Sequence, residues 1–373
     1  MALMLLSMAS KGSCSTSLSA PSASPSYEEW KKAHEKKYAS AEEETMRRSI
    51  FESEKLNVEK HNALYAAGES TYWLKLNAFS DLTNEEWRTS FLMSQKYVDQ
   101  SAQSRKQNDD AAAAAASTSK WRFEHTEVTD GTSIDWRDHG VVGAVQNQGS
   151  CGSCWAFAGM GAAASTVAIK KGVNTSSEYQ YGSVQEVLDC CPYGDATYDC
   201  WSCDGGEPVT MMGWLADKSH GFDTQDDWPY ISGSCGGGQC YTCDETKLED
   251  PASNVMSIDG GERPPQNNET ALMQALMTRP VSIDIDVEGS FRSYGGGIFT
   301  DAACGETIWH AVLLVGFNYA GSDDLADSYF IMQNSWGTSW GDAGYMLMGM
   351  GVDAPHGVCC LACYPAIALL DDE

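Results

Sequence analysis

The sequence of residues 146–157 is Gln-Asn-Gln-Gly-Ser-Cys-Gly-Ser-Cys-Trp-Ala-Phe, a glycine-rich turn that leads into a cysteine and an alanine-rich run. The run 155–171 contains no proline and is followed by Gly172, so the sequence predicts a helix over residues 154–171. The free N–H groups and the positive dipole end at a helix start favour a thiolate over a thiol. Cys154 is therefore the candidate nucleophile.

A thiolate nucleophile requires a base, and the base requires an orienting group. His310 lies just inside the apolar run 308–317, which predicts a buried strand. A second apolar run, 329–332, is followed by Asn334-Ser335-Trp336-Gly337. A histidine in an apolar run is usually a core residue, but the cysteine upstream and this tetrapeptide downstream favour a catalytic role for His310.

These segments resemble the active-site segments of papain-family cysteine peptidases, and the resemblance covers the chain from about residue 27 to residue 365. It implies that Cys154 is the nucleophile and that His310 is the acid and base. It also implies that Asn334 orients His310 and that Trp336 covers their bond from water. The side-chain amide of Gln148 and the N–H of Cys154 are expected to form the oxyanion hole.

The resemblance implies an α+β fold, the papain-like two-subdomain fold, with a helical half packed against an antiparallel β-barrel-like half and a small helical prodomain before both. Apolar patterning agrees with this division. Helices are predicted over residues 154–171, about 183–190 and 208–219, and strands near 281–287, 308–317, 328–333 and 344–350.

A second resemblance lies upstream, where six residues at helical spacing share one face: Glu43, Arg47, Phe51, Glu54, Val58 and Asn62. With Asn77-x-Phe79-x-Asp81 they are similar to the prodomain motifs of cathepsin L-like zymogens, although Glu54, Val58 and Lys75 replace the usual Asn, Ile and Gly. Such prodomains lie across the substrate cleft in the non-cleavable direction and inhibit the enzyme. An unrelated amphipathic helix is the alternative interpretation.

Four segments are expected along the chain. Residues 1–22 read as a signal peptide or leader, 23–94 as the inhibitory prodomain, and 127–373 as the mature peptidase. Alternation through residues 72–79 suits a short strand. Residues 95–126 are polar and include six consecutive alanines, without a periodicity that argues for packing, so we expect a linker, or at most a frayed helix, that carries the activation cleavage.

Fourteen cysteines indicate an oxidising compartment, because a free Cys154 and a leader Cys14 leave twelve for up to six disulfides. The resemblance implies the pairs Cys151–Cys203 and Cys304–Cys359, a partner for Cys190 among Cys235, Cys240 and Cys243, and an added Cys191–Cys200 bridge as in cathepsin B. The pairing of the two left from that group, together with Cys360 and Cys363, stays open.

The alternative for the same cysteines is a zinc site or a redox site, since three Cys-x-x-Cys pairs occur. A zinc ribbon would not require the Gln, His and Asn-Ser-Trp-Gly as well, and no βαβ pattern surrounds the first pair. We therefore expect no metal and no cofactor.

Charge is concentrated in the second part of the chain, with 16 basic and 17 acidic residues up to residue 126 but only eight basic and 35 acidic residues after it. Nucleic acid and anionic membranes are unfavourable partners for such a surface. No stretch approaches the roughly 20 apolar residues of a membrane span. We expect the secretory pathway, then a lysosome, a vacuole or the extracellular space, with an acidic lumen relieving the repulsion. Selection for solubility is the alternative. Asn174 and Asn268 begin glycosylation sequons.

In the papain family the second substrate residue before the cut enters a pocket, and the resemblance places Gly205, Gly206, Glu207, Asp284 and Ile308 around it. Two acids at positions that are usually apolar suggest a preference for Lys or Arg. The bulky Trp309 is expected to narrow the leaving-group side, beside Trp336. No histidine-bearing insert resembles the cathepsin B occluding loop, which favours an endopeptidase.

The sequence therefore predicts a cysteine endopeptidase made as a zymogen, a monomer that acts on peptides and proteins. Its own prodomain and cystatin-like proteins are the expected inhibitors. The alternative is a catalytically silent homologue that binds peptides or inhibitors.

Overall fold

The computed structural model describes residues 24–103, 105, 121–173, 181–217, 221–235, 242–249, 256–301, 303–351 and 356–370. The expected leader, the sequon at Asn174 and half of the expected linker lie outside these ranges. We call residues 24–105 the prosegment and residues 127–373 the mature domain.

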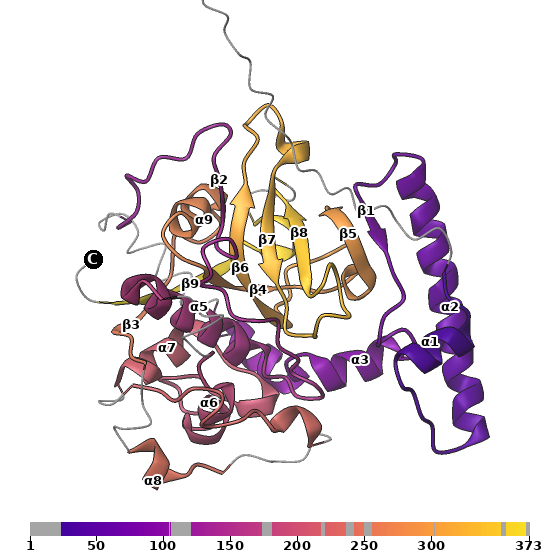
Figure 1. The fold of residues 1–373 in the computed structure, drawn as a ribbon, viewed down its shortest axis with the longest axis horizontal. Coiled ribbons are helices and arrows are strands. Elements are labelled where there is room, and N and C mark those ends of the chain that lie inside the picture. The colour runs from indigo at the N-terminus through magenta and orange to yellow at the C-terminus, as the bar shows by residue number, and fades with distance from the viewer. Residues whose placement is uncertain are drawn as a thin grey trace, which may run out of the picture.

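The mature domain has a helical half and a sheet half, which confirms the expected papain-like α+β fold (Figure 1). Its helices are α5 (Cys154–Lys171), α6 (Val184–Cys190), α7 (Pro208–Asp217), α8 (Glu245–Leu248) and α9 (Glu269–Leu276). Short 3-10 turns join several of these elements.

The strands of the mature domain are β2 (Ser133–Asp135), β3 (Gly260–Glu262), β4 (Val281–Ile285), β5 (Tyr294–Phe299), β6 (His310–Asn318), β7 (Tyr329–Gln333), β8 (Tyr345–Gly349) and β9 (Tyr364–Leu369). Together with β1 (Tyr72–Leu74) they form one sheet with the order β1-β5-β8-β7-β6-β4-β9-β3, and β2 pairs with β6. All neighbours are antiparallel except β5 and β8. The outer strand β1 (Tyr72–Leu74) comes from the prosegment.

Helix α5 runs through the centre of the mature domain and is buried from its first residue to Ala168. Small residues allow neighbours to approach it on two sides. Gly159 faces the Met211 side chain of α7, and Gly161 faces Leu313 of β6, each so closely that a Cβ atom would clash. The helix is therefore held between the two halves by packing that its alanines and glycines permit.

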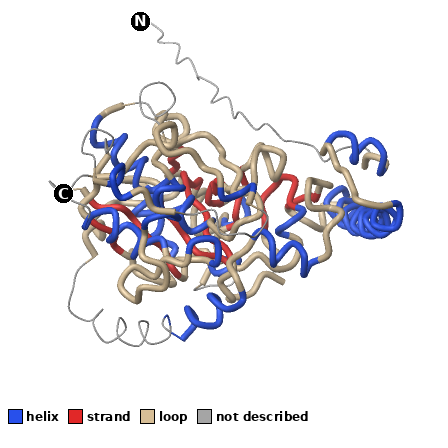
Figure 2. The backbone as a smooth tube through the Cα atoms, turned by 90° about the horizontal axis from the view of Figure 1, so that it is seen from below, coloured by secondary structure: helices blue, strands red, loops and turns tan. Residues whose placement is uncertain are grey.

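The prosegment begins with two packed helices, α1 (Tyr27–Ala33) and α2 (Ala41–Ala66), and continues into α3 (Asn84–Phe91). Figure 2 shows α2 at one end of the molecule. Motif residues of α2 make contacts within the prosegment. Phe51 packs on Trp30. The Asn62 amide donates to the carbonyl of Leu74 at 2.9 Å and accepts from its N–H at 2.8 Å. Arg47 donates to Glu86 of α3 at 2.7 Å.

Strand β1 extends the mature sheet by pairing with β5, where the Trp73 ring covers Gly295 and Gly296. The strand ends at Leu74, earlier than the alternation through residues 72–79 predicts. The cause is a local turn, because Phe79 N–H donates to the Asn77 side chain at 2.9 Å. Side-chain bonds of this kind compete with strand pairing.

Residues 95–105 differ from the expected linker. Residues 95–103 and 105 are helical, and Tyr97, Val98, Ser101 and Arg105 are buried against the mature domain. These positions share one helical face, but a serine and an arginine among them hide the apolar periodicity on which the prediction of a linker depends.

Five disulfides join pairs of cysteines that are both described: Cys151–Cys203, Cys190–Cys243, Cys191–Cys200, Cys304–Cys359 and Cys360–Cys363. Cys235 is also disulfide-bonded. Cys154 is the free cysteine among the residues that the structure covers. Each of the three Cys-x-x-Cys pairs contributes sulfur to these bridges, and a bridged sulfur is no longer the thiolate that a zinc site requires.

Candidate active site

Three elements of the mature domain converge at the site. Cys154 is the first residue of α5, His310 is the first residue of β6, and Asn334 follows directly after β7. Because α5 packs on β6, and β6 pairs with β7, the three side chains are brought together from positions up to 180 residues apart in the sequence.

The imidazole of His310 is fixed on one side. Its Nε2 lies 2.8 Å from Oδ1 of Asn334, and the Trp336 ring stacks on it at 4.6 Å. Trp336 is only 2% exposed, so it shields the bond between His310 and Asn334 from water. The other ring nitrogen, Nδ1, has no hydrogen-bond partner among the described residues. An imidazole held in this way can present Nδ1 to a reacting group.

The sulfur of Cys154 is completely buried, and burial raises its pKa to about 12. The backbone N–H of Ala311 in β6 and those of Trp155 and Cys154 at the start of α5 lower this pKa, but burial, together with the charge of Asp284, outweighs them. Burial also lowers the pKa of His310 to about 4, although its bond to Asn334 raises it. Under the prosegment the site therefore holds a neutral thiol and a neutral imidazole, which differs from the ionised sulfur that the helix start alone predicts.

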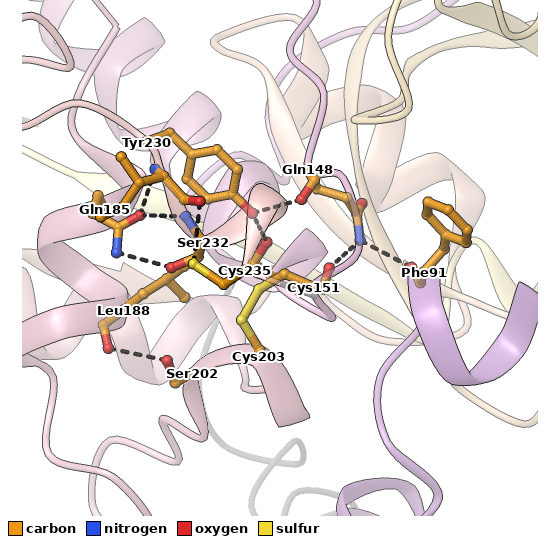
Figure 3. Close-up of a disulfide and its surroundings, with 12 residues drawn as sticks. Phe91, Gln148, Cys151, Gln185, Leu188, Ser202, Cys203, Tyr230, Ser232 and Cys235 are labelled. Atoms are coloured by element: carbon orange, nitrogen blue, oxygen red, sulfur yellow. Dashed lines mark hydrogen bonds between the residues drawn. A yellow bond between two sulfur atoms is a disulfide. The ribbon is translucent and has the colours of Figure 1, made fainter. Parts of the chain in front are cut away.

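The amide of Gln148 is oriented by the mature domain and occupied by the prosegment. Its Oε1 accepts from the Ser335 hydroxyl at 2.6 Å, and its Nε2 donates to the carbonyl of Cys151 at 2.8 Å. The same Nε2 donates to the carbonyl of Phe91 at 2.9 Å, beside the Cys151–Cys203 disulfide (Figure 3). A prosegment carbonyl thus accepts from the amide that is expected to bind the oxyanion.

Beyond Phe91 the prosegment follows the cleft as an extended chain. The carbonyl of Leu92 lies against Gly152, where a Cβ atom would come within 2.7 Å. Met93 N–H donates to the carbonyl of Trp309 at 3.0 Å, and Ser94 N–H donates to that of Asp204 at 2.7 Å. Backbone hydrogen bonds of this kind are how an extended peptide binds in a cleft.

An aromatic cluster forms one side of the site. Trp336 contacts Phe79 and Trp87 of the prosegment at ring distances of 5.6 and 5.5 Å. Trp309 is 8% exposed, and the guanidinium of Arg88 lies 5.2 Å from its ring. The prosegment residues 79–91 therefore cover this side, and the residues after them cover the other.

The expected side-chain pocket lies on that other side. Gly205 faces the ring of Tyr97, and Gly206 faces Trp155, both at distances that no side chain would tolerate. Next to them Glu207 is 6% exposed and Asp284 is fully buried. Ile308 is also buried and packs with the Cys360–Cys363 bridge.

Burial and the neighbouring Glu207 raise the pKa of Asp284 well above its usual range. Burial acts on Glu207 in the same direction, but the charges of Arg263 and Arg105 outweigh it and hold its pKa below the usual value. Sequence reasoning did not identify either arginine as part of this site. Helical spacing of the buried residues in 97–105 is the signal that could have identified Arg105.

The sequon asparagine Asn268 is exposed and caps helix α9, where its Oδ1 accepts from the N–H of Ala271 at 3.0 Å. A glycan would be attached to the amide nitrogen, which is not the atom that makes this cap.

Two family descriptions match the chain. Residues 131–367 match the papain family of cysteine proteases, and residues 27–87 match the cathepsin propeptide inhibitor domain. The chain belongs to the papain family. It is a cysteine endopeptidase with a propeptide that marks it as a cathepsin L-like zymogen.

The sequences of relatives from this family align with nearly the full length of this chain. A cathepsin L-like proteinase of Phaedon cochleariae is 32% identical over 348 residues, which span 91% of this chain and 93% of the relative. Vignain of Ricinus communis is 33% identical over 346 residues, or 90% of this chain and 83% of the relative.

Solved structures of precursors have the same fold. A recombinant stem bromelain precursor matches with a TM-score of 0.71 and 27% identity, covering 93% of this chain and 98% of that one. Digestive procathepsin L2 from the midgut of Tenebrio molitor larvae matches with a TM-score of 0.73 and 28% identity, covering 92% and 98%. None of the helices that the structure describes is long and apolar enough to cross a membrane.

Proposed function

We propose that this zymogen yields an active peptidase in which Cys154, His310, Asn334 and Gln148 carry the reaction. Their arrangement supports it: one imidazole nitrogen is held by Asn334 at 2.8 Å while the other is without a hydrogen-bond partner among the described residues. Once the prosegment leaves and water returns, the penalty that burial imposes on the charged forms of Cys154 and His310 falls. The helix-start N–H groups then favour the thiolate.

In the proposed reaction Nδ1 of His310 takes the proton of the Cys154 thiol, and the sulfur attacks the peptide carbonyl carbon. The carbonyl oxygen becomes an oxyanion that accepts from Gln148 Nε2 and the Cys154 N–H. His310 gives its proton to the leaving amine, the C–N bond breaks, and a thioester remains. His310 then takes a proton from water as the water attacks the thioester. The carboxylic acid leaves, and the thiol and imidazole are restored.

The prosegment blocks this reaction because the Phe91 carbonyl already occupies the Gln148 amide. Its direction opposes cleavage. Prosegment residues 79–91 cover the leaving-group side, and the later buried residues Tyr97 and Arg105 cover the pocket for the second residue before the cut. A substrate chain would pass this pocket first and the leaving-group side afterwards. We propose that activation cuts the chain between Arg105 and Ser133, and that residues 1–22 are removed as a leader.

The proposed route is the secretory pathway, with a lysosome, a vacuole or the extracellular space as destination. Disulfides and the acidic mature domain support an oxidising and then acidic environment. As part of the same proposal, Asn174 and Asn268 accept glycans, the enzyme acts as a monomer on peptides and proteins, and cystatin-like proteins inhibit it.

The test is covalent labelling of the acid-processed enzyme with an epoxide thiol inhibitor. We expect one label per chain on Cys154, loss of peptidase activity on labelling, and no label in Cys154→Ala. A folded and processed chain that takes no label and cleaves no peptide would instead be the silent homologue.

A further inference from the structure

The buried pocket beside the catalytic cysteine contains a side chain of the prosegment. Arg105 Nη2 donates to Asp284 Oδ2 at 2.8 Å and to Glu207 Oε2 at 3.0 Å. The Arg105 side chain is only 9% exposed, and its guanidinium lies 4.7 Å from the centre of the Tyr364 ring. An arginine this far from water requires partners of opposite charge, and the mature domain supplies both of them.

Of the two acids, Glu207 alone has an ion pair within the described part of the mature domain. Arg263 of the mature domain lies 2.9 Å from the other oxygen of Glu207. The described ion pairs of Asp284, in contrast, are made with Arg105 alone. Departure of the prosegment therefore takes the guanidinium away from a carboxyl group that has no exposed surface.

A substrate can take the place of Arg105 with one cationic side chain that donates to the same two acids. The pocket is bounded by Ile308 and Tyr364, and a cavity of about 240 Å³ between these residues and the helical segment 95–105 adjoins the Arg105 side chain. An arginine side chain already fits there with its guanidinium bonded to both acids. An apolar side chain would leave Asp284 buried and unpaired, which is costly.

We propose that Arg105 is a built-in occupant of the specificity pocket: it holds the zymogen closed through Glu207 and Asp284, and the active enzyme uses the same two carboxylates to select arginine or lysine two residues before the scissile bond. This inference rests on the proposed function, because it assumes that cleavage occurs at Cys154. It adds a residue of the prosegment that neither prodomain motif contains and names the class of substrate.

The first experiment measures selectivity in the processed wild-type enzyme, with active sites counted by epoxide titration. Two fluorogenic dipeptide substrates are compared. Both have arginine directly before the scissile bond, and the residue preceding that arginine is either arginine or leucine. We expect kcat/KM to be at least roughly tenfold higher for the arginine substrate, and Asp284→Asn to lower this ratio at least roughly tenfold, as for loss of a charge-assisted bond. Glu207→Gln should lower it in the same direction.

The second experiment compares activation of full-length zymogens at one acidic pH. We expect Arg105→Ala to process at least roughly tenfold faster than the wild type, and Arg105→Lys to stay closer to it, because the pocket retains a cation. Lys96→Ala is the matched control, since Lys96 lies in the same helical segment but over the ring of Trp201. Thermal unfolding of each zymogen shows whether the variants fold.

The outcomes separate this inference from the proposed function. A processed chain that takes no epoxide label contradicts both. A labelled, active enzyme that cleaves the leucine substrate as fast as the arginine substrate overturns the inference alone. Equal activation of wild type, Arg105→Ala and Lys96→Ala overturns the part that assigns Arg105 to closing the zymogen.

Discussion

Removal of the prosegment should increase the fraction of Cys154 that is present as thiolate. In the zymogen burial raises the pKa of Cys154 to about 12 and lowers that of His310 to about 4. A thiolate–imidazolium pair requires the opposite order, with the thiol pKa below the imidazole pKa. Between pH 4 and pH 12 the buried site therefore holds the two neutral forms.

The size of the effect follows from the ionised fraction. A thiol with a pKa of about 12 is ionised to only ~10⁻⁵ at pH 7, whereas an activated thiol with a pKa below 7 is mostly thiolate. Since the thiolate is the reacting species, alkylation could differ by up to ~10⁵-fold. Transient opening of the prosegment reduces this ratio, and we expect at least ~10³-fold.

The assay is alkylation with iodoacetamide at pH 7, followed by intact mass, with the site located by peptide mapping under non-reducing conditions. The zymogen reaction is counted only in chains that keep their full mass. The processed enzyme provides the fast reference, and Cys154→Ala reports background labelling. If full-length zymogen is alkylated within tenfold of the processed rate, burial does not hold the thiol protonated and this account of latency is wrong.

Two further predictions concern the cleft. Gln148→Ala should lower kcat by ~10²–10³-fold with a smaller change in KM, because the amide acts mainly on the oxyanion. Both constants are measured on processed enzyme after epoxide titration. A variant with a changed KM and an unchanged kcat would contradict this role. Glu54→Gln should speed acid activation at least roughly tenfold, because it weakens the 3.5 Å pair with Arg292 of the mature domain, whose side chain is 11% exposed. Glu52→Gln, exposed on the same helix, should activate at the wild-type rate, and identical rates for both variants would exclude the ion pair as a restraint.

Local composition was sufficient to predict most of the framework. The alanine-rich run after Cys154 forms α5 over the predicted residues, and the apolar runs around His310 and before Asn334 form β6 and β7. These elements could be predicted because helix and strand formation depends on residues a few positions apart. Their side chains carry recognisable chemistry, so candidate residues followed from the same segments.

Contacts between distant segments could not be predicted in this way. The partner of Cys190 lies 53 residues away and depended on how two loops meet in space. The packing of the segment around Arg105 on the mature domain was not predicted because one of its buried positions is an arginine, and only the carboxylates of the mature domain make an arginine a buried residue.

The sequence by itself determined which groups this protein can use: a cysteine at a helix start, a histidine and an asparagine on neighbouring strands, and an upstream inhibitory segment. Only the tertiary structure decided their state. Burial in the assembled zymogen raises the pKa of Cys154 and lowers that of His310, which widens the gap between them, and folding joins Arg105 to acids 102 and 179 residues away. Desolvation and long-range pairing arise from the assembled surroundings of a side chain, which no local stretch of sequence contains.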